Sequence, residues 1–295
     1  MNLLKISFFL VLISCSTFSK KEQILTEDEN IKLNDQDTEV EKVKITNYNF
    51  VAHFYDKSYG SILINGIPIV YRSLEDTKSS SRSNSLPIGD LLVNGTNTIQ
   101  LIGDFQEDKY EIGVYQNEVI QSGQLADEDI KIELKKSNSN FFTFDINNIP
   151  YHIWDDGEDF KASDYENLAT LVKRMDHIIK KGQVKKYIEL HKIEIQEAVK
   201  RINSIGHLSF SFKEMEDDLK DSFKTIRKGK EFTAIDISID EIKYHISTSK
   251  KLATITHKNK PYLTGFRDNE FPKQVWEWKM LYMKKNGKFI PILDY

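Results

Sequence analysis

Short apolar runs separated by turn residues fill the first half of the chain. Residues 47–55 alternate between apolar and polar, which is typical of a half-buried strand. Two apolar runs flank Asn65-Gly66, the strongest short signal for a β-hairpin. The predicted strands are 47–55, 61–64, 67–71, 91–93, 98–102, 110–115, 129–134 and 140–146. Short strands spaced by turns, with no helical segment among them, predict an antiparallel β-sandwich over residues 45–154.

Two stretches between these strands contain the residues of turns and loops. Residues 94–97 read Asn-Gly-Thr-Asn and predict a tight turn, and residues 78–85 predict a polar loop. The segment 86–101 resembles part of a galactose-binding-like jelly roll, in which a loop enters a strand, turns at Asn-Gly and resumes. This resemblance rests on turn chemistry, so it supports the sandwich and not sugar binding.

The period of the apolar residues becomes helical after residue 160. Three segments carry apolar residues at helical spacing: 165–179, 184–202 and 215–226. Capping boxes, Ser163 with Glu166 and Ser211 with Glu214, predict the start of the first and third helices. The acidic run 155–159 before them lacks the ligand spacing of an EF-hand loop and is interpreted as an interdomain hinge.

After residue 230 the period becomes two, which predicts a meander of antiparallel strands. The predicted strands are 235–239, 242–246, 252–257, 261–266, 276–282 and 288–293. Three helices followed by a curved antiparallel sheet predict a second, α+β domain over residues 160–295. This order resembles the nuclear-transport-factor-like or cystatin-like cone, where a bent sheet wraps a helix and leaves a pocket. Because that fold serves enzymes, ligand binders and structural modules, it assigns no activity.

The first residues have the organisation of a secretory signal. Lys5 precedes an apolar run of about nine residues, less than half of the roughly 20 that a membrane-spanning helix needs. The run ends in Leu12-Ile13-Ser14-Cys15, which resembles a bacterial lipobox. The resemblance implies a signal peptide over 1–14, cleavage before Cys15 and acylation of the Cys15 thiol and amine. A plain signal peptide with a chance cysteine is the alternative.

The lipobox resemblance also implies a location. Ser16, rather than Asp, follows the cysteine, which implies an outer-membrane protein, anchored by lipid and facing the periplasm or the exterior. Residues 15–44 carry dense mixed charge and isolated apolar residues, too few to bury a core. We therefore expect a flexible tether; a short amphipathic helix through Ile24, Leu25, Ile31 and Leu33 is the alternative.

Composition excludes several classes of function. The net charge of −4 gives no basic field for nucleic acid, and one cysteine excludes a multi-cysteine metal site. The sequence contains no Gly-x-Ser-x-Gly, phosphate-loop, Gly-x-Gly-x-x-Gly or His-Glu-x-x-His motif. We therefore expect no enzymatic activity, no cofactor and no metal.

Few residues are candidates for a site. Catalysis in a cone would need an acid–base pair at its mouth, and Asp236 with His245 is the pair we consider, with Asp240 and His257 as further candidates. Two observations weigh against catalysis by these residues. His245 holds an outward position of its strand, and His257 lies beside residues 258–260, which are interpreted as a turn. On the second helix, His191 shares the apolar face and is interpreted as a hydrogen-bonded core histidine.

An aromatic stripe marks the late strand. Its alternate positions are occupied by Trp276, Trp278, Met280 and Tyr282. This stripe is interpreted as core facing the helices. The alternative is a surface for a partner, formed by Trp276, Trp278 and Tyr282.

These observations predict a membrane-anchored, non-enzymatic lipoprotein that binds another protein, for example as an immunity protein or inhibitor against a toxin. The alternatives are a glycan-binding lipoprotein using Tyr55, Tyr59 and Tyr71, a small-molecule binder, or a cone-pocket enzyme.

Overall fold

The fold was analysed in a computed structural model. It describes residues 44–55, 58–74, 82–120, 129–149, 152–193, 195–196, 199, 211–228, 232–235, 241–257, 264–268, 275–278 and 280–292. The predicted signal peptide, Cys15, the predicted tether up to residue 43, Asp236 and Asp240 lie outside the described residues.

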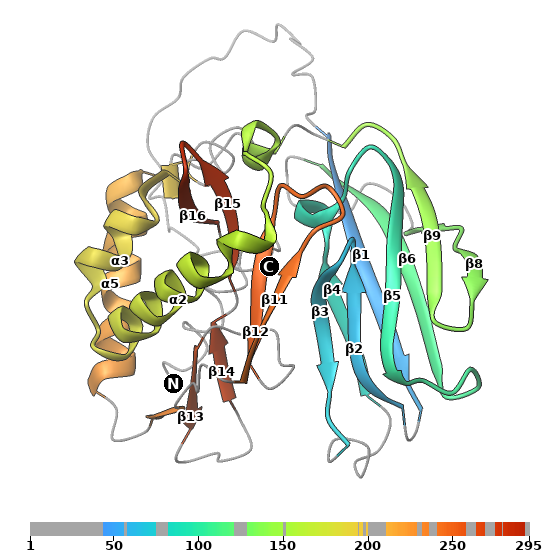
Figure 1. The fold of residues 1–295 in the computed structure, drawn as a ribbon, viewed down its shortest axis with the longest axis horizontal. Coiled ribbons are helices and arrows are strands. Elements are labelled where there is room, and N and C mark those ends of the chain that lie inside the picture. Colours follow the sequence, from blue (N-terminus) through green and yellow to red (C-terminus); the bar gives the residue numbers. More distant parts are fainter. Residues whose placement is uncertain are drawn as a thin grey trace, which may run out of the picture.

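Two antiparallel sheets make up the first half of the chain and pack face to face (Figure 1). The first has the order β4 (Arg82–Pro87), β1 (Lys44–Phe54), β6 (Tyr110–Ile120), β7 (Ile130–Ile132). The second has the order β3 (Ile67–Arg72), β2 (Tyr59–Ile64), β5 (Gly95–Asp104), β9 (Phe141–Ile146), β8 (Lys135–Asn138). Their inward side chains, with Phe50, Phe54 and Phe144 at 0–1% exposure, form one apolar cluster.

The predicted hairpin at Asn65-Gly66 is confirmed, whereas the strand and turn predicted over residues 91–97 are wrong. Asn65 and Gly66 join β2 to β3 with φ of 48° and 84°. In place of the strand at 91–93 and the turn at 94–97, the chain forms a 3-10 helix, η2 (Gly89–Leu91), and Gly95 already begins β5. The side chain of Asn97 holds this connection, because it accepts from the Val93 amide and donates to the Val93 carbonyl, both at 2.9 Å.

Asn65 does more than form a turn. Its side chain is buried, and its Nδ2 donates to the Leu91 carbonyl at 2.8 Å and to Asn97 Oδ1 at 2.7 Å. Its Oδ1 accepts the Thr98 amide at 2.9 Å. The hairpin turn is therefore fixed to both the η2 connection and β5.

The polar stretch predicted as a loop contributes a strand. Within it, β4 begins at Arg82 and pairs with β1 from Phe54 to Asn49. β4 lies at the edge of its sheet and has a neighbouring strand on one side only. Polar residues such as Ser and Asn are compatible with this exposed position.

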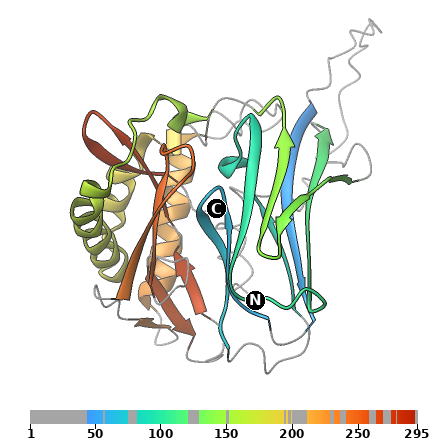
Figure 2. The same cartoon turned by 45° about the vertical axis from the view of Figure 1, so that its right-hand side comes forward.

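Helices and two further sheets form the second half. The helices are α2 (Tyr165–Lys180), α3 (Val184–Leu190) and α5 (Phe212–Lys228). One sheet has the order β11 (Ile242–Ile246), β12 (Ala253–His257), β15 (Leu281–Lys285), β16 (Lys288–Ile292), and the other β10 (Phe232–Ile235), β13 (Thr264–Asp268), β14 (Val275–Trp278). The helices cover the face of the β11–β16 sheet that points away from the first half (Figures 1 and 2).

The prediction of one curved sheet with a long strand at 276–282 is therefore corrected. That strand is broken between β14 and β15, which belong to different sheets. Next to the break, the Met280 carbonyl accepts the hydroxyl of buried Thr254 at 2.7 Å. The predicted second helix is also interrupted, since α3 ends at Leu190 and His191 follows in a turn.

One of the two predicted capping boxes exists. The Ser211 Oγ accepts the Glu214 amide at 3.1 Å, and Glu214 Oε2 accepts the Ser211 amide at 2.7 Å. The box at Ser163 is wrong, because Ser163 lies within a 3-10 turn and α2 follows Asp164, whose carboxylate accepts the Lys161 amide at 2.9 Å.

The two halves share an apolar core. Leu252, Leu281, Met283 and Ile292 of the second half belong to the same cluster as the inward residues of the first two sheets. The Thr248 amide donates to the Asn65 carbonyl at 2.8 Å across this junction.

The acidic run is a bound connector and not a hinge. It includes a 3-10 helix, η3 (Ile153–Asp156). The Glu158 amide donates to the Lys284 carbonyl at 2.7 Å, and Lys251 Nζ donates to the Gly157 carbonyl at 2.7 Å. These bonds tie the connector to β15 and to the turn between β11 and β12.

Candidate functional site

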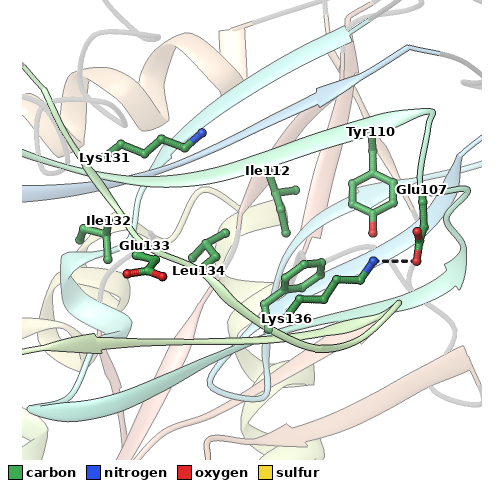
Figure 3. Close-up of a pocket in the computed structure, with 9 residues that line it drawn as sticks. Glu107, Tyr110, Ile112, Lys131, Ile132, Glu133, Leu134 and Lys136 are labelled. Carbon is green, nitrogen blue, oxygen red and sulfur yellow. Dashed lines mark hydrogen bonds and ion pairs between the residues drawn. The ribbon is translucent and has the colours of Figure 1, made fainter.

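A groove opens at one margin of the first half, where the chain crosses from β7 in one sheet to β8 in the other. Its volume is about 590 Å³. We call it the edge groove, and it is lined by Glu107, Tyr110, Ile112, Lys131, Ile132, Glu133, Leu134, Lys136 and Phe142 (Figure 3).

The floor of the edge groove is apolar. Ile112, Ile132 and Leu134 are partly buried and pack against the core, and Phe142 is 9% exposed. Tyr110 adds its ring edge-on to Phe105, and its hydroxyl donates to the Ser139 carbonyl at 3.0 Å. Burial raises the pKa of Tyr110, so its hydroxyl is neutral at physiological pH and acts as a fixed donor.

The rim is charged and balanced. Two lysines, Lys131 and Lys136, stand with two glutamates, Glu107 and Glu133. Lys136 Nζ lies 2.7 Å from Glu107 Oε1, and both side chains are exposed (Figure 3). A rim with no net charge attracts neither a phosphate nor a metal ion, whereas an apolar floor with a few polar groups is the usual composition of a binding site.

The backbone of β6 is open along part of the groove. β6 pairs with β1 over its whole length, but β7 pairs with it only at Val114, Tyr115 and Gln116. Beside Tyr110 and Ile112, no strand within the described ranges pairs on the side away from β1. The groove thus occupies the place into which a longer β7 would extend.

The groove extends from the middle of the sandwich toward the end that is remote from residue 44. Lys44 begins β1 and pairs with Ile120, whereas Phe54 at the other end pairs with Tyr110. Eleven residues of strand span about 35 Å. Lys44 and Tyr110 are therefore separated by the length of the sandwich.

The catalytic candidates do not converge in the described part of the chain. His245 Nε2 lies 3.1 Å from Thr256 Oγ1, and burial, followed by Lys243, lowers the pKa of His245. His257 ends β12, in agreement with the strand predicted at 252–257, is 2% exposed, and lies 3.2 Å from Glu241 Oε2. The β11–β12 register places the two histidines on opposite faces of the sheet.

The aromatic stripe is placed in part. Tyr282 is 0% exposed and packs in the core beneath the helices, so it offers no surface to a partner. Of Trp276 and Trp278 only the backbone, in β14, is described. On the second helix, His191 is 1% exposed and stacks on Tyr187 at 4.2 Å between ring centroids, which confirms a core histidine.

Sequence reasoning missed the edge groove. Ile112, Leu134 and Phe142 are ordinary apolar residues of predicted strands, and nothing in their spacing distinguishes a floor from a closed core. The apolar alternation of residues 130–134 predicts a strand longer than β7, which ends at Ile132, so the sequence does not indicate where the groove opens.

Comparisons with family models, with curated proteins and with solved structures return no match. Within the described ranges, no three acidic, histidine or cysteine side chains are grouped to hold a metal ion. None of the described helices has the length and apolar character to cross a bilayer.

Proposed function

We propose that this protein is a lipid-anchored lipoprotein of the bacterial envelope that binds another protein through the edge groove. It is built from a β-sandwich domain over 45–154 and an α+β domain over 160–295, joined through a common core. The proposal assigns no catalytic step to the chain. The immunity protein or inhibitor considered above is one form of this function.

The position of the groove is the observation that carries the proposal. A lipid at Cys15 would hold the protein by its N-terminus, and the segment up to residue 43 would separate the bilayer from Lys44. The groove extends from the middle of β1 to the end opposite Lys44, where Tyr110 pairs with Phe54. A partner in the periplasm or outside the cell would reach it without competing with the membrane.

The glycan alternative receives less support from the geometry. Tyr55 is 48% exposed, but Tyr59 and Tyr71 are half-buried, and the Tyr110 ring in the groove packs against Phe105. Stacking on a sugar needs an open ring face, which none of the groove residues provides.

Two measurements test the proposal in intact cells. For the anchor, labelling with an alkyne fatty acid should mark the wild-type chain and leave the Cys15→Ser variant unlabelled and unprocessed.

For the partner, a photo-crosslinking amino acid at Lys131, on the rim, should give a discrete heavier adduct. The matched control places the same amino acid at Lys173, an exposed position of α2. Absence of label on the wild type, or equal adducts from both positions, would overturn the proposal.

A further inference from the structure

The orientation of the β6 backbone follows from one hydrogen bond. The Tyr55 amide donates to the Lys109 carbonyl at 2.9 Å, in line with the β1–β6 register. In an antiparallel pair, alternate residues direct both N–H and C=O toward the same neighbour. The odd-numbered residues of β6 therefore face β1, and the even-numbered ones, among them Tyr110 and Ile112, face the other side.

This orientation leaves a donor and an acceptor at the groove. Val114 and Gln116 face β7 and are paired with it, at Ile132 and Ile130. The N–H and C=O of Ile112 point along the same edge, where no described strand continues. Its side chain, like that of Val114, points inward and contributes to the floor.

The edges formed by β8, β4 and β3 are protected. β8 carries Lys135 and Lys136 and has all its residues exposed, β4 ends in Pro87, and β3 contacts β11 and β12. Lysine, proline and covering elements are the usual means of preventing strand pairing. Among the described residues, none of these lies on the edge at Ile112, and the lysines stand at its rim.

From these observations we infer that the edge groove binds an extended segment of the partner protein by strand addition, a mode that rests on the proposed function. The segment pairs its backbone with Ile112 where β7 stops, and inserts one apolar side chain between the sheets onto Leu134 and Phe142. Complementarity selects this occupant: a donor and acceptor for a peptide backbone, an apolar floor for alternate side chains, and a rim with no net charge.

Amide exchange tests the premise in the uncomplexed protein. The Ile112 amide should exchange quickly with deuterium, while the Glu111 and Gly113 amides, which face β1, exchange slowly. Slow exchange at Ile112 in a dilute monomer would overturn the inference. If that protection disappears when residues 16–43 are removed, the occupant is the chain's own N-terminal segment; if it grows with protein concentration, it is a second copy.

Binding is tested with a displayed library of ten-residue random peptides selected on the soluble chain from residue 16. Two variants distinguish the contribution of the Ile112 backbone to peptide binding from that of its side chain. Ile112→Pro removes the outward N–H and leaves the β1 ladder intact, a change that edge strands tolerate. Ile112→Ala removes the side chain but keeps the N–H, and therefore serves as the matched control.

Selected peptides should carry apolar residues at alternate positions, protect the Ile112 amide, and bind Ile112→Pro about tenfold more weakly than Ile112→Ala, as expected for a lost backbone bond. Equal affinity for the two variants, or no peptide that protects Ile112, would overturn the strand-addition mode. The crosslink from Lys131 is read separately, so an adduct that persists in Ile112→Pro would leave the proposed function standing while rejecting this mode.

Discussion

At the scale of single residues, Asn65 and His191 show two consequences of burying a polar side chain. Asn65 uses both ends of its side-chain amide, which bonds to Leu91, Asn97 and Thr98. These hydrogen bonds compensate the loss of hydration of Nδ2 and Oδ1 on burial. His191 is buried beside Tyr187, where desolvation lowers its pKa to about 3. The first side chain fixes a turn, whereas the second makes the fold sensitive to acid.

The pKa of His191 predicts the direction of the pH dependence. Above pH 6.5 the imidazole is neutral in both the folded and unfolded states, and the fold has its full stability. As the pH falls from 6.5 toward 3, the unfolded chain binds a proton that the folded chain does not, so stability is lost. At pH 5 we expect a loss of about 2 kcal/mol from this group alone.

Denaturant titrations at pH 7.5 and 5.0 measure this loss. His191→Gln keeps a polar side chain without a titrating group, and its stability should depend on pH by about 2 kcal/mol less than that of the wild type. The same pH dependence in both proteins would contradict the assignment.

At the scale of elements, periodicity predicted most helices and strands, and the failures have identifiable causes. The hairpin at Asn65 and the box at Ser211 form because the signal and the bonds that satisfy it lie within a few residues. The strand at 91–93 fails because Asn97 captures that backbone, and β4 was missed because β1 supplies its partner from about thirty residues away.

The two predicted capping boxes give an element-scale test. Ser211→Ala should lower the free energy of unfolding by about 1 kcal/mol, because the first turn of α5 loses the acceptor for its Glu214 amide. Ser163→Ala should change it by less than about 0.5 kcal/mol, since Asp164 and not Ser163 precedes α2. Chemical denaturation of the two variants beside the wild type makes the comparison. Equal losses would show that the caps are wrongly assigned.

At the scale of the whole molecule, the two predicted domains are joined by a core and by a turn. The hairpin turn at Asn65-Gly66 lies against Ser247 and Thr248, so the tip of one half is packed into the other. Such an interface couples the unfolding of the two halves, unlike the mobile interface expected between separate domains.

Two glycines with similar backbone conformations measure this coupling. Gly66 (φ 84°) and Gly287 (φ 68°) both follow asparagine in a turn, but a Cβ at Gly66 would meet the Ile246 carbonyl at 2.9 Å, and at Gly287 it would meet nothing within 4 Å. We expect Gly287→Ala to cost about 1 kcal/mol and Gly66→Ala about 2–3 kcal/mol.

Hydrogen exchange shows which elements are destabilised in the Gly66→Ala variant. Protection should fall together in β5 of the first half and in α2 of the second, because the two halves unfold as one unit. A decrease confined to β5, with α2 at its wild-type protection, would show that the halves are independent.

By itself the sequence determined the N-terminal lipobox resemblance, the succession of strands, helices and strands, and the hairpin turn at Asn65-Gly66. These depend on composition and on contacts between residues close in the chain. Only the tertiary structure decided that the late strands divide into two sheets, that the acidic connector is bound, and that β6 keeps an open edge at Ile112. Each of these depends on which distant segment supplies a hydrogen-bond partner, and periodicity along one segment carries no information about its neighbour.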